Sequence, residues 1–253
     1  MKAMDIIIHG CTGRMGSIIT DMLENGFHGH SLAAGVDARC PSGLVPRRCV
    51  HLDEFEGQAG CVIDFSHHSA AAELTEYCVR RNLPLVIATT GQSEGEQEII
   101  RAAARKIPLF YSANMSVGVA LVAQMARQAA AMFPDADIEI IERHHNKKLD
   151  VPSGTALLLA NSIRQALPES EFLIGRHRDG LRTKNEIGIH SLRCGNEVGT
   201  HEVVIATGTQ TITIKHEAED RTLFAEGAIA AAEFLHGKPA GYYTMAELIN
   251  EGE

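Results

Sequence analysis

A short apolar run, a glycine-rich turn and an amphipathic stretch follow one another at the start of this chain. Residues 6–8 are three isoleucines, residues 10–16 read GCTGRMG, and residues 17–23 have the apolar spacing of a helix. A buried strand, a tight turn and a helix in this order open a dinucleotide-binding βαβ unit. The glycine spacing is G-x-x-G-x-x-G rather than the usual G-x-G-x-x-G, because Thr12 stands where the middle glycine is expected.

Each of the three glycines has its own steric role in such a unit. Gly10 allows the tight turn, Gly13 lets the backbone approach a pyrophosphate, and Gly16 lets the helix lie close to the sheet. A second apolar run, residues 33–36, ends at Asp37, about twenty residues after the glycines, where a ribose hydroxyl is usually bound. A glycine turn can be purely structural, but the turn, the strand, the helix and the acid together favour dinucleotide binding.

The alternation of short apolar runs and helical stretches continues to about residue 115. The expected strands are residues 60–65, 85–90 and 109–112, and the expected helices are residues 69–82 and 94–106. This alternation predicts a parallel sheet covered on both faces. Small or polar residues stand at three strand ends, 64–66, 88–91 and 112–115. Each can be an ordinary turn, but three at the carboxyl edge of one sheet favour a ligand site.

Beyond a helix expected over residues 117–132, the pattern changes to strands that alternate polar and apolar residues. The expected strands are residues 138–144, 188–193, 202–206 and 211–215, with a hairpin turn at 207–209 between the last two. A helix at 153–166 is expected to cover one face of this sheet. Two further helices, at 223–235 and 242–249, are expected to return to the first domain.

The chain is therefore predicted to be an α/β protein of two domains. Residues 1–116 and 222–253 would form a Rossmann-type doubly wound parallel sheet, and residues 117–221 a second, α+β domain with an open mixed sheet. A length of 253 residues is enough for two modest cores. The uncovered face of the second sheet would leave apolar surface in need of a partner, which predicts a homo-oligomer.

Composition limits the partners and the compartment. A formal net charge of −9 argues against nucleic acid and membrane surfaces, which favour a basic face. No apolar stretch approaches the roughly 18 residues of a membrane span, and no signal peptide is expected before the first strand. The six cysteines have no C-x-x-C spacing and indicate thiols in a cytoplasmic protein. The pairs His67–His68 and His144–His145 would point to opposite faces of a strand, so no metal is expected.

The segment with the most reactive side chains is residues 142–156, ERHHNKKLDVPSGTA. It offers His144 as a proton carrier, His145 as a second imidazole, and Lys147 or Lys148 as a cation. The Ser-Gly-Thr turn then opens an apolar helix, whose free N–H groups and dipole hold an anion such as a carboxylate. A solvated loop before a helix is the simpler alternative. A cation, an acid and an anion cradle together indicate a site that grips a small carboxylated molecule and moves a proton on it.

Taken together, these motifs resemble the dihydrodipicolinate reductase family, also called the 4-hydroxy-tetrahydrodipicolinate reductases. The likeness runs from residue 5 to residue 249 and is carried by five blocks: GCTGRMG at 10–16, ATTG at 88–91, SANMSVG at 112–118, the block at 142–156, and RTLFAEGA at 221–228. The histidine–lysine–Ser-Gly-Thr block is highly specific to that family, whereas the glycine block alone is not.

The resemblance implies NAD(P)H-dependent reduction of 4-hydroxy-tetrahydrodipicolinate in diaminopimelate and lysine biosynthesis, by a homotetramer. It assigns His144 as the general acid/base and, through the family spacing H-H-x-x-K, Lys148 as the second catalytic group. It implies that the substrate carboxylates are held by His145, Ser153, Gly154 and Thr155. It implies that the cofactor is lined by Gly10, Cys11, Thr12, Gly13, Arg14, Met15, Asp37, Ala88, Thr89, Thr90, Ser112, Ala113, Asn114 and Met115.

The chemistry of such a reduction agrees with these roles. After loss of water from the 4-hydroxy substrate, hydride given to the unsaturated ring leaves an electron-rich neighbouring carbon. That carbon needs a proton, which histidine can supply near neutral pH. Lys148 would stabilise the developing negative charge and assist the loss of hydroxide.

Two residues depart from the family pattern. Met115 stands where an aromatic side chain is expected in the loop on the nicotinamide side. Ala38 separates Asp37 from Arg39, whereas an arginine directly after the acid is the usual clamp for a 2′-phosphate. We therefore expect NADH to serve at least as well as NADPH, although Arg39 or Arg14 can still reach a phosphate.

Two alternatives are a non-catalytic protein, from another functional class, and another two-domain nicotinamide enzyme, such as a semialdehyde or homoserine dehydrogenase. A non-catalytic NAD(P)-binding regulator would be free to lose its proton donor, whereas this chain keeps the whole set of histidine, lysine, glycine and threonine. A semialdehyde dehydrogenase would need a nucleophilic cysteine that opens a helix, and Cys194 lies in a strand-to-turn setting instead.

Overall fold

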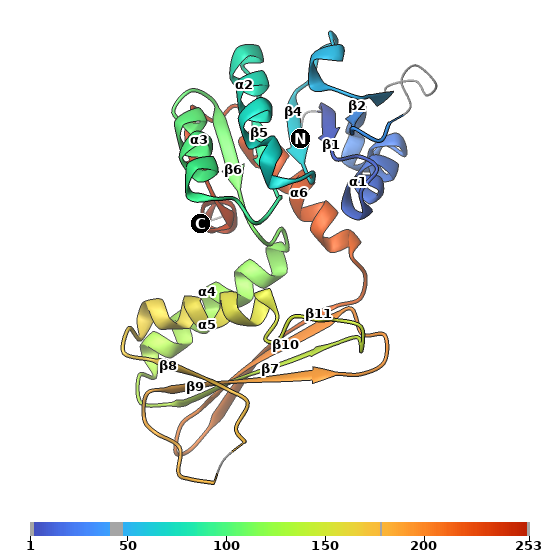
Figure 1. Ribbon diagram of the computed structural model, residues 1–253. Helices are drawn as coiled ribbons and strands as arrows, with labels where there is room; N and C mark the ends of the chain where they lie inside the picture. Colours follow the sequence, from blue (N-terminus) through green and yellow to red (C-terminus); the bar gives the residue numbers. More distant parts are fainter. Residues whose placement is uncertain (1–2, 41–47, 178, 252–253) are drawn as a thin grey trace. The chain divides into compact units, whose positions relative to one another are not determined.

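The computed structural model describes residues 3–40, 48–177 and 179–251 of the chain (Figure 1). It divides into two compact units. Unit 1 comprises Met1–Ser116 and Thr222–Glu253, and unit 2 comprises Val117–Arg221. The chain therefore leaves unit 1 once and returns to it.

Unit 1 is built on a parallel sheet in the order β12-β6-β5-β4-β1-β2-β3. Its strands are β1 (Asp5–His9), β2 (Ser31–Val36), β3 (Arg48–Cys49), β4 (Cys61–Asp64), β5 (Leu85–Ile87), β6 (Pro108–Tyr111) and β12 (Gly241–Tyr243). From β1 the chain winds first toward β3 and then, from β4, toward the opposite edge. This reversal beside β1 is the switch point at which ligands bind in doubly wound sheets. The expected Rossmann-type fold is confirmed.

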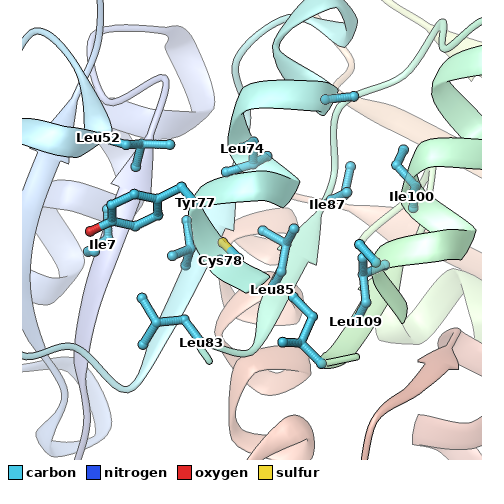
Figure 2. Close-up of a cluster of buried hydrophobic side chains, with 14 of the residues drawn as sticks. Ile7, Leu52, Leu74, Tyr77, Cys78, Leu83, Leu85, Ile87, Ile100 and Leu109 are labelled. Atoms are coloured by element: carbon cyan, nitrogen blue, oxygen red, sulfur yellow. The ribbon is translucent and has the colours of Figure 1, made fainter. Parts of the chain in front are cut away.

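Helices cover both faces of the unit 1 sheet. They are α1 (Arg14–Glu24), α2 (Ala71–Arg81), α3 (Glu94–Ala104), α6 (Thr222–Leu235) and α7 (Met245–Asn250). The helices α1 and α6 pack on one face. On the other face, α2 and α3 close a core that includes Leu74, Tyr77, Leu85 and Ile100 (Figure 2). Because Leu85 is fully buried, its truncation to alanine would cost about 2–5 kcal/mol of stability.

The end of the chain differs from the expected single helix over residues 242–249. Gly241–Tyr243 instead form β12, which pairs in parallel with β6, and α7 begins only at Met245. Thr244 explains the boundary, because it forms a capping box with Glu247 and so starts the helix after the two tyrosines. The two-residue strand β3 was also not expected, since so short a strand carries no periodic signal.

Unit 2 contains a mixed sheet in the order β11-β10-β7-β9-β8. Its strands are β7 (Asp137–His144), β8 (Glu171–Ile174), β9 (Glu186–Arg193), β10 (Gly199–Ala206) and β11 (Thr211–Ala218). The expected hairpin joins β10 to β11, where Thr207 N–H donates to Gln210 O at 2.8 Å. The strands β8, β9 and β7 are parallel, and β10 is antiparallel to β7. The expected mixed sheet is confirmed, with β8 as an additional strand.

The two faces of this sheet differ in character. The helices α4 (Val117–Met132) and α5 (Gly154–Ala166) pack on the face that carries Ile138, Ile140 and Ile205. Successive side chains of a strand point to opposite faces, so Glu139 and Ile141 lie on the other one. Around Glu139 that face carries ion pairs rather than a continuous apolar surface. This face of the sheet is therefore more polar than expected for a surface that binds an apolar partner.

Candidate active site

The glycine turn after β1 has the steric properties expected of it. Gly10 adopts φ +84°, and a Cβ there would lie 2.8 Å from Phe65 backbone atoms. A Cβ on Gly16 would lie 2.0 Å from the Gly10 carbonyl oxygen, so α1 approaches the turn as closely as only glycine allows. Gly13 N–H donates to Gly10 O at 3.0 Å and closes the turn.

The start of α1 is open to an anion. Gly13 is the N-cap residue, and no side chain caps the helix. Free N–H groups and the helix dipole at such a start favour a phosphate. Arg14 is exposed and Met15 is half-buried at this end. Cys11 instead faces the interior, with its thiol 3.5 Å from that of Cys40, and burial raises its pKa to about 12.

Asp37 is held in its ionised form beside this turn. Burial alone would raise the pKa of its carboxyl group, but hydrogen bonds from Arg39 and Thr12 outweigh burial and hold the pKa well below its usual range. Thr12 donates its hydroxyl at 2.6 Å and its N–H at 3.2 Å to Asp37 Oδ2. The residue that breaks the usual glycine spacing therefore fixes the acid that follows β2.

A pocket of about 420 Å³ opens beside these residues. Gly10, Gly13, Asp37 and Arg39 contribute to its walls. The other wall residues, which sequence reasoning missed, include His9, Val50, His51, His67 and Glu73. A volume of this order suits a small-molecule site. The pocket, the uncapped helix and the ionised Asp37 therefore fit a dinucleotide.

Asp64, at the end of β4, ties three strand ends together. Its carboxylate is 2% exposed and accepts from the hydroxyls of Ser66 and Thr89, each at 2.6 Å. His9 Nδ1 lies 2.9 Å from the same carboxylate. Since these residues end β1 and follow β4 and β5, the carboxylate holds together the edge at which ligands bind. The hydrogen bond to Asp64 therefore occupies the Thr89 hydroxyl within the protein.

Ser112 extends the same edge beyond β6. Its N–H donates to Ile87 O at 3.1 Å, and its hydroxyl donates to Asn114 O at 2.6 Å. The other residues expected here differ in exposure: Ala88 and Met115 are buried, and Thr90 and Ala113 are exposed. The three strand ends predicted to share one edge do so, because Asp64 pairs with Ile87 and Ile87 with Tyr111.

In unit 2 a second cluster surrounds His144, the last residue of β7. Glu142 lies two residues earlier, so strand alternation places both side chains on the helix-covered face. Glu142 is 0% exposed, and its Oε2 is 2.6 Å from His144 Nδ1. Both guanidinium nitrogens Nη1 and Nη2 of Arg193 donate to this carboxylate at 2.8 Å, and Ser153 N–H donates at 3.1 Å.

These contacts define the protonation of the pair. Burial alone would raise the pKa of Glu142, but the hydrogen-bond donors around its carboxylate, Arg193 foremost, outweigh burial and lower the pKa to about 2. An ionised carboxylate only accepts hydrogen bonds, so His144 Nδ1 carries a hydrogen toward it. Burial lowers the pKa of His144, and Glu142 opposes that shift. In the described part of the chain, His144 Nε2 has no hydrogen-bond partner, so this atom is the one that can exchange a proton.

Ser153 and His201 support the start of α5. The Ser153 hydroxyl accepts from Ala156 N–H at 3.2 Å as the helix cap, and it lies 3.1 Å from His201 Nε2. The His201 ring meets the His144 ring edge to face, with centroids 5.1 Å apart. Burial, followed by the His144 charge, lowers the pKa of His201 to about 3. His201 is therefore an uncharged residue whose ring packs against His144 in the cluster.

Of the two adjacent lysines, only Lys148 is tied into the cluster. Its Nζ lies 2.9 Å from Asp150 Oδ1, and its charge lowers the pKa of both His144 and His201. Lys147 is exposed and has no ion pair among the described residues. The two lysines, which the residues alone left as alternatives, thus have different surroundings.

The remaining residues expected to bind substrate lie around the same loop. His145 is half-buried, and its Nδ1 is buried with no partner in the described part of the chain. Gly154 is exposed at the first turn of α5, and a Cβ there would meet nothing within 4 Å. Thr155 follows it in the same turn. Gly154 therefore faces open space, whereas Ser153, 1% exposed, serves as the internal cap of the helix.

Sequence reasoning missed Glu142, Arg193 and His201. The alternation of β7 could have paired Glu142 with His144 on one face. No comparable signal pointed to Arg193 and His201, because they reach the cluster from other strands through the register of the sheet. Among the described residues, no group of three or more potential ligands is placed to hold a metal ion, and no helix has both the length and the apolarity to cross a membrane.

A doubly wound sheet with a glycine-rich turn and a pocket beside its first strand is typical of nicotinamide-dependent oxidoreductases. Two family models, described as the N-terminus and the C-terminus of dihydrodipicolinate reductase, match residues 4–115 and 118–249. The chain belongs to the dihydrodipicolinate reductase family, an NAD(P)H-dependent one.

Individual relatives agree with this assignment. A 4-hydroxy-tetrahydrodipicolinate reductase of Caldanaerobacter subterraneus subsp. tengcongensis is 43% identical over 98% of each chain. One of Clostridium tetani is 42% identical over 97% of this chain and 96% of that protein. The solved structure of a dipicolinate-bound dihydrodipicolinate reductase from Paenisporosarcina sp. TG-14 shares the fold, with a TM-score of 0.81, 23% identity and coverage of 96% of this chain and 98% of that one.

Proposed function

We propose that this chain reduces 4-hydroxy-tetrahydrodipicolinate to tetrahydrodipicolinate in the diaminopimelate route to lysine. One observation carries the proposal within the family: a single buried carboxylate, Glu142, accepts hydrogen bonds from the proton carrier His144 and from the start of α5. A proton donor and an anion-binding helix start beside each other suit a substrate that carries carboxylates and takes up a proton.

The cofactor in this proposal is NADH or NADPH, which supplies the hydride when bound. The uncapped start of α1 and Gly10 to Met15 would hold the pyrophosphate, and Asp37 would accept a hydrogen bond from the adenosine ribose. Ala88 to Thr90 and Ser112 to Met115 would line the rest of the site. The open pocket beside Gly13 and Asp37 supports this assignment.

His144 protonates the ring carbon next to the one that receives hydride, through its Nε2. The hydrogen bond from Nδ1 to Glu142 supports this choice of atom. Lys148 stabilises the negative charge that develops and assists the loss of hydroxide from the 4-hydroxy substrate. His145 and the N–H groups of Gly154 and Thr155 hold the substrate carboxylates, and Ser153 keeps the helix start in place.

We propose that NADH serves at least as well as NADPH. The side chain of Arg39 donates to Asp37 from Nε at 3.2 Å and from Nη2 at 3.3 Å. An arginine bound to the acid in this way has fewer donors left for a 2′-phosphate, and the ionised Asp37 repels that phosphate. Asp37 itself is well suited to the free 2′-hydroxyl of NADH.

The protein is further proposed to act in the cytoplasm as a homotetramer assembled through the unit 2 sheet. The six cysteines remain as thiols, as expected for a reducing compartment. The face of the sheet opposite α4 and α5 carries Leu192, which is 44% exposed, together with the ion pairs around Glu139, so the proposed contact between copies combines apolar and polar groups. Light scattering of the purified protein tests this: the mass of a monomer, 27.4 kDa, would contradict it.

A coupled assay tests the activity. Pyruvate, aspartate semialdehyde and a dihydrodipicolinate synthase generate the substrate, while the absorbance of NADH or NADPH is followed separately. Oxidation that depends on the synthase is the expected result, and the ratio of the two rates tests the role of Asp37 and Arg39. Cofactor binding by fluorescence without any oxidation would overturn the proposal and favour a non-catalytic binding protein.

A further inference from the structure

Glu142 is a fully buried carboxylate, and hydrogen-bond donors from three different residues occupy all of its acceptor sites. Its partners are the Nδ1 of His144, the guanidinium of Arg193 and the N–H of Ser153. A charge with no solvent contact is tolerated only when it is paired and fully hydrogen-bonded. The cluster is therefore a rigid unit in which moving one member leaves another without its partner.

The partners of Glu142 come from different elements of unit 2. His144 ends β7, Arg193 ends β9, and Ser153 precedes α5. Arg193 also donates from Nη2 to the Asp150 carbonyl oxygen at 2.7 Å, and so holds the loop on which Lys148 lies. One ion pair thus connects the proton carrier, the helix start and the lysine loop.

We propose that Glu142 and Arg193 are a positioning pair, which holds the Nδ1–H form of His144 and the start of α5 in one fixed arrangement. The proposal rests on the proposed function, because it assigns the reaction's proton donor a partner that selects its reactive nitrogen. Neither residue is proposed to touch the substrate.

The consequence for the proton step follows from the valence of the imidazole. With Glu142 as acceptor, protonated His144 gives up the proton on Nε2 and keeps the one on Nδ1. The neutral ring then presents a lone pair on Nε2, which takes the next proton from solvent. In Glu142→Gln a single amide oxygen replaces two carboxylate oxygens. Where the amide N–H₂ faces the ring, it donates to Nδ1, so neutral His144 carries its hydrogen on Nε2 and that atom cannot take up the next proton.

Several titratable and charged groups face His144. They are the carboxylate of Glu142, the guanidinium of Arg193, the Lys148–Asp150 ion pair and the neutral His201 ring. Among them, Glu142 raises the pKa of His144, while Lys148 and Arg193 lower it. Loss of the Glu142 charge is therefore expected to lower the pKa of His144 further.

The same strand offers a matched control. Glu139 also accepts from an arginine and faces a histidine: Arg182 Nη1 donates to it at 2.7 Å, and His190 Nε2 lies 2.7 Å away. Its odd position on β7 places it on the opposite face of the sheet. Glu139→Gln therefore breaks a similar trio of residues without contacting the His144 cluster.

The experiment compares Glu142→Gln with Glu139→Gln in the full-length protein. The readouts are kcat, KM and the pH profile of kcat in the coupled assay, with circular dichroism and NADH fluorescence as checks of folding and of unit 1. Loss of a group that orients a reactive side chain typically costs about 10- to 100-fold. We expect such a loss of kcat for Glu142→Gln, with the alkaline limb of its profile moved to lower pH, and an unchanged profile for Glu139→Gln.

A second variant keeps the proposal testable if Glu142→Gln fails to fold. Arg193→Lys retains a positive charge but not the two parallel hydrogen bonds. It is expected to raise KM for the 4-hydroxy substrate and to lower kcat, while NADH binding stays unchanged. Wild-type kinetics in either variant that folds would overturn the positioning role. An inactive wild-type protein would instead overturn the proposed function, so the two failures are distinguishable.

Discussion

The strand β7 carries two glutamates with similar partners and opposite surroundings. Glu142 lies against one arginine and one histidine, and Glu139 against two arginines and one histidine, but their side chains are 0% and 27% exposed. In solvent, such ion pairs contribute about 0–1 kcal/mol and their side chains rearrange easily. Away from solvent, the same residue types must keep one arrangement. Burial rather than residue type therefore distinguishes a candidate site from a surface network.

The histidines of the two clusters give the strongest test of this comparison. We expect His144→Gln to lower kcat by about 100- to 10,000-fold, because a general acid is lost, with little change in NADH affinity. His190→Gln removes the matching imidazole beside Glu139 and is expected to leave kcat within about twofold, as is usual away from a site. Coupled assays of both variants check this. Equal kcat values for the two variants would contradict the assignment of His144.

The two lysines after β7 provide the next test. Lys148→Met removes a cation that acts on His144 and is expected to lower kcat/KM by about 10- to 100-fold, the usual worth of a hydrogen bond to a charged group. Lys147→Met removes an exposed cation and is expected to change kcat/KM little. If the second variant loses as much as the first, the two lysines share the role.

Acid stability tests the burial itself. The pKa of His201 is about 3 in the folded protein, below the ordinary 6.5 of the unfolded chain. The unfolded chain therefore binds a proton below pH 6.5 while the folded protein does not, and stability falls as the pH drops toward 3. Between pH 7 and pH 5 this contributes a loss of about 2 kcal/mol. Urea unfolding of His201→Gln should show a smaller loss than wild type; an equal loss would mean that His201 is not buried and neutral.

The smallest expected effects come from substitutions of two glycines, Gly199 beside His144 and Gly188 beside Glu139. A Cβ on Gly199 would lie 2.9 Å from His144 Nε2, and one on Gly188 would lie 1.6 Å from Glu139 Oε2. Because Glu142 holds the His144 ring, Gly199→Ala is expected to displace Nε2 and lower kcat about 10-fold. Gly188→Ala is expected to push the partly exposed Glu139 side chain aside, at about 0–1 kcal/mol of stability and no loss of kcat. Kinetics and urea unfolding of both check this, and equal kcat losses would break the comparison.

Local chemistry made much of the fold predictable. The expected bounds of α4 match the structure, and those of α5 and α6 differ by one residue at their starts. Each of these helices begins or ends at a residue that interrupts the helical spacing of apolar side chains. The strands β3, β8 and β12 escaped prediction because two to four residues carry too little alternation, and because pairing with a neighbour rather than composition fixes them.

The candidate site was predictable where its residues are contiguous in the sequence. In the glycine turn and in the block from His144 to Thr155, the spacing of the residues along the chain indicates their local geometry. Glu142, Arg193 and His201 meet only through the register of β7, β9 and β10, where Glu142 pairs with Ser191 and with His201. Asp37 shows the reverse case. Thr12 departs from the usual glycine pattern, and its hydrogen bonds hold Asp37 in place.

The interrupted order of unit 1 has a consequence for synthesis on the ribosome. Its sheet receives β12 from Gly241–Tyr243, and α6 packs against β4, β5 and β6. Both elements are translated after the whole of Val117–Arg221. The core of unit 2 can therefore close while one layer of unit 1 is still missing, the reverse of the usual N-terminal-first order. The nascent chain can therefore complete the cluster around His144 before the sheet of unit 1 has all its strands.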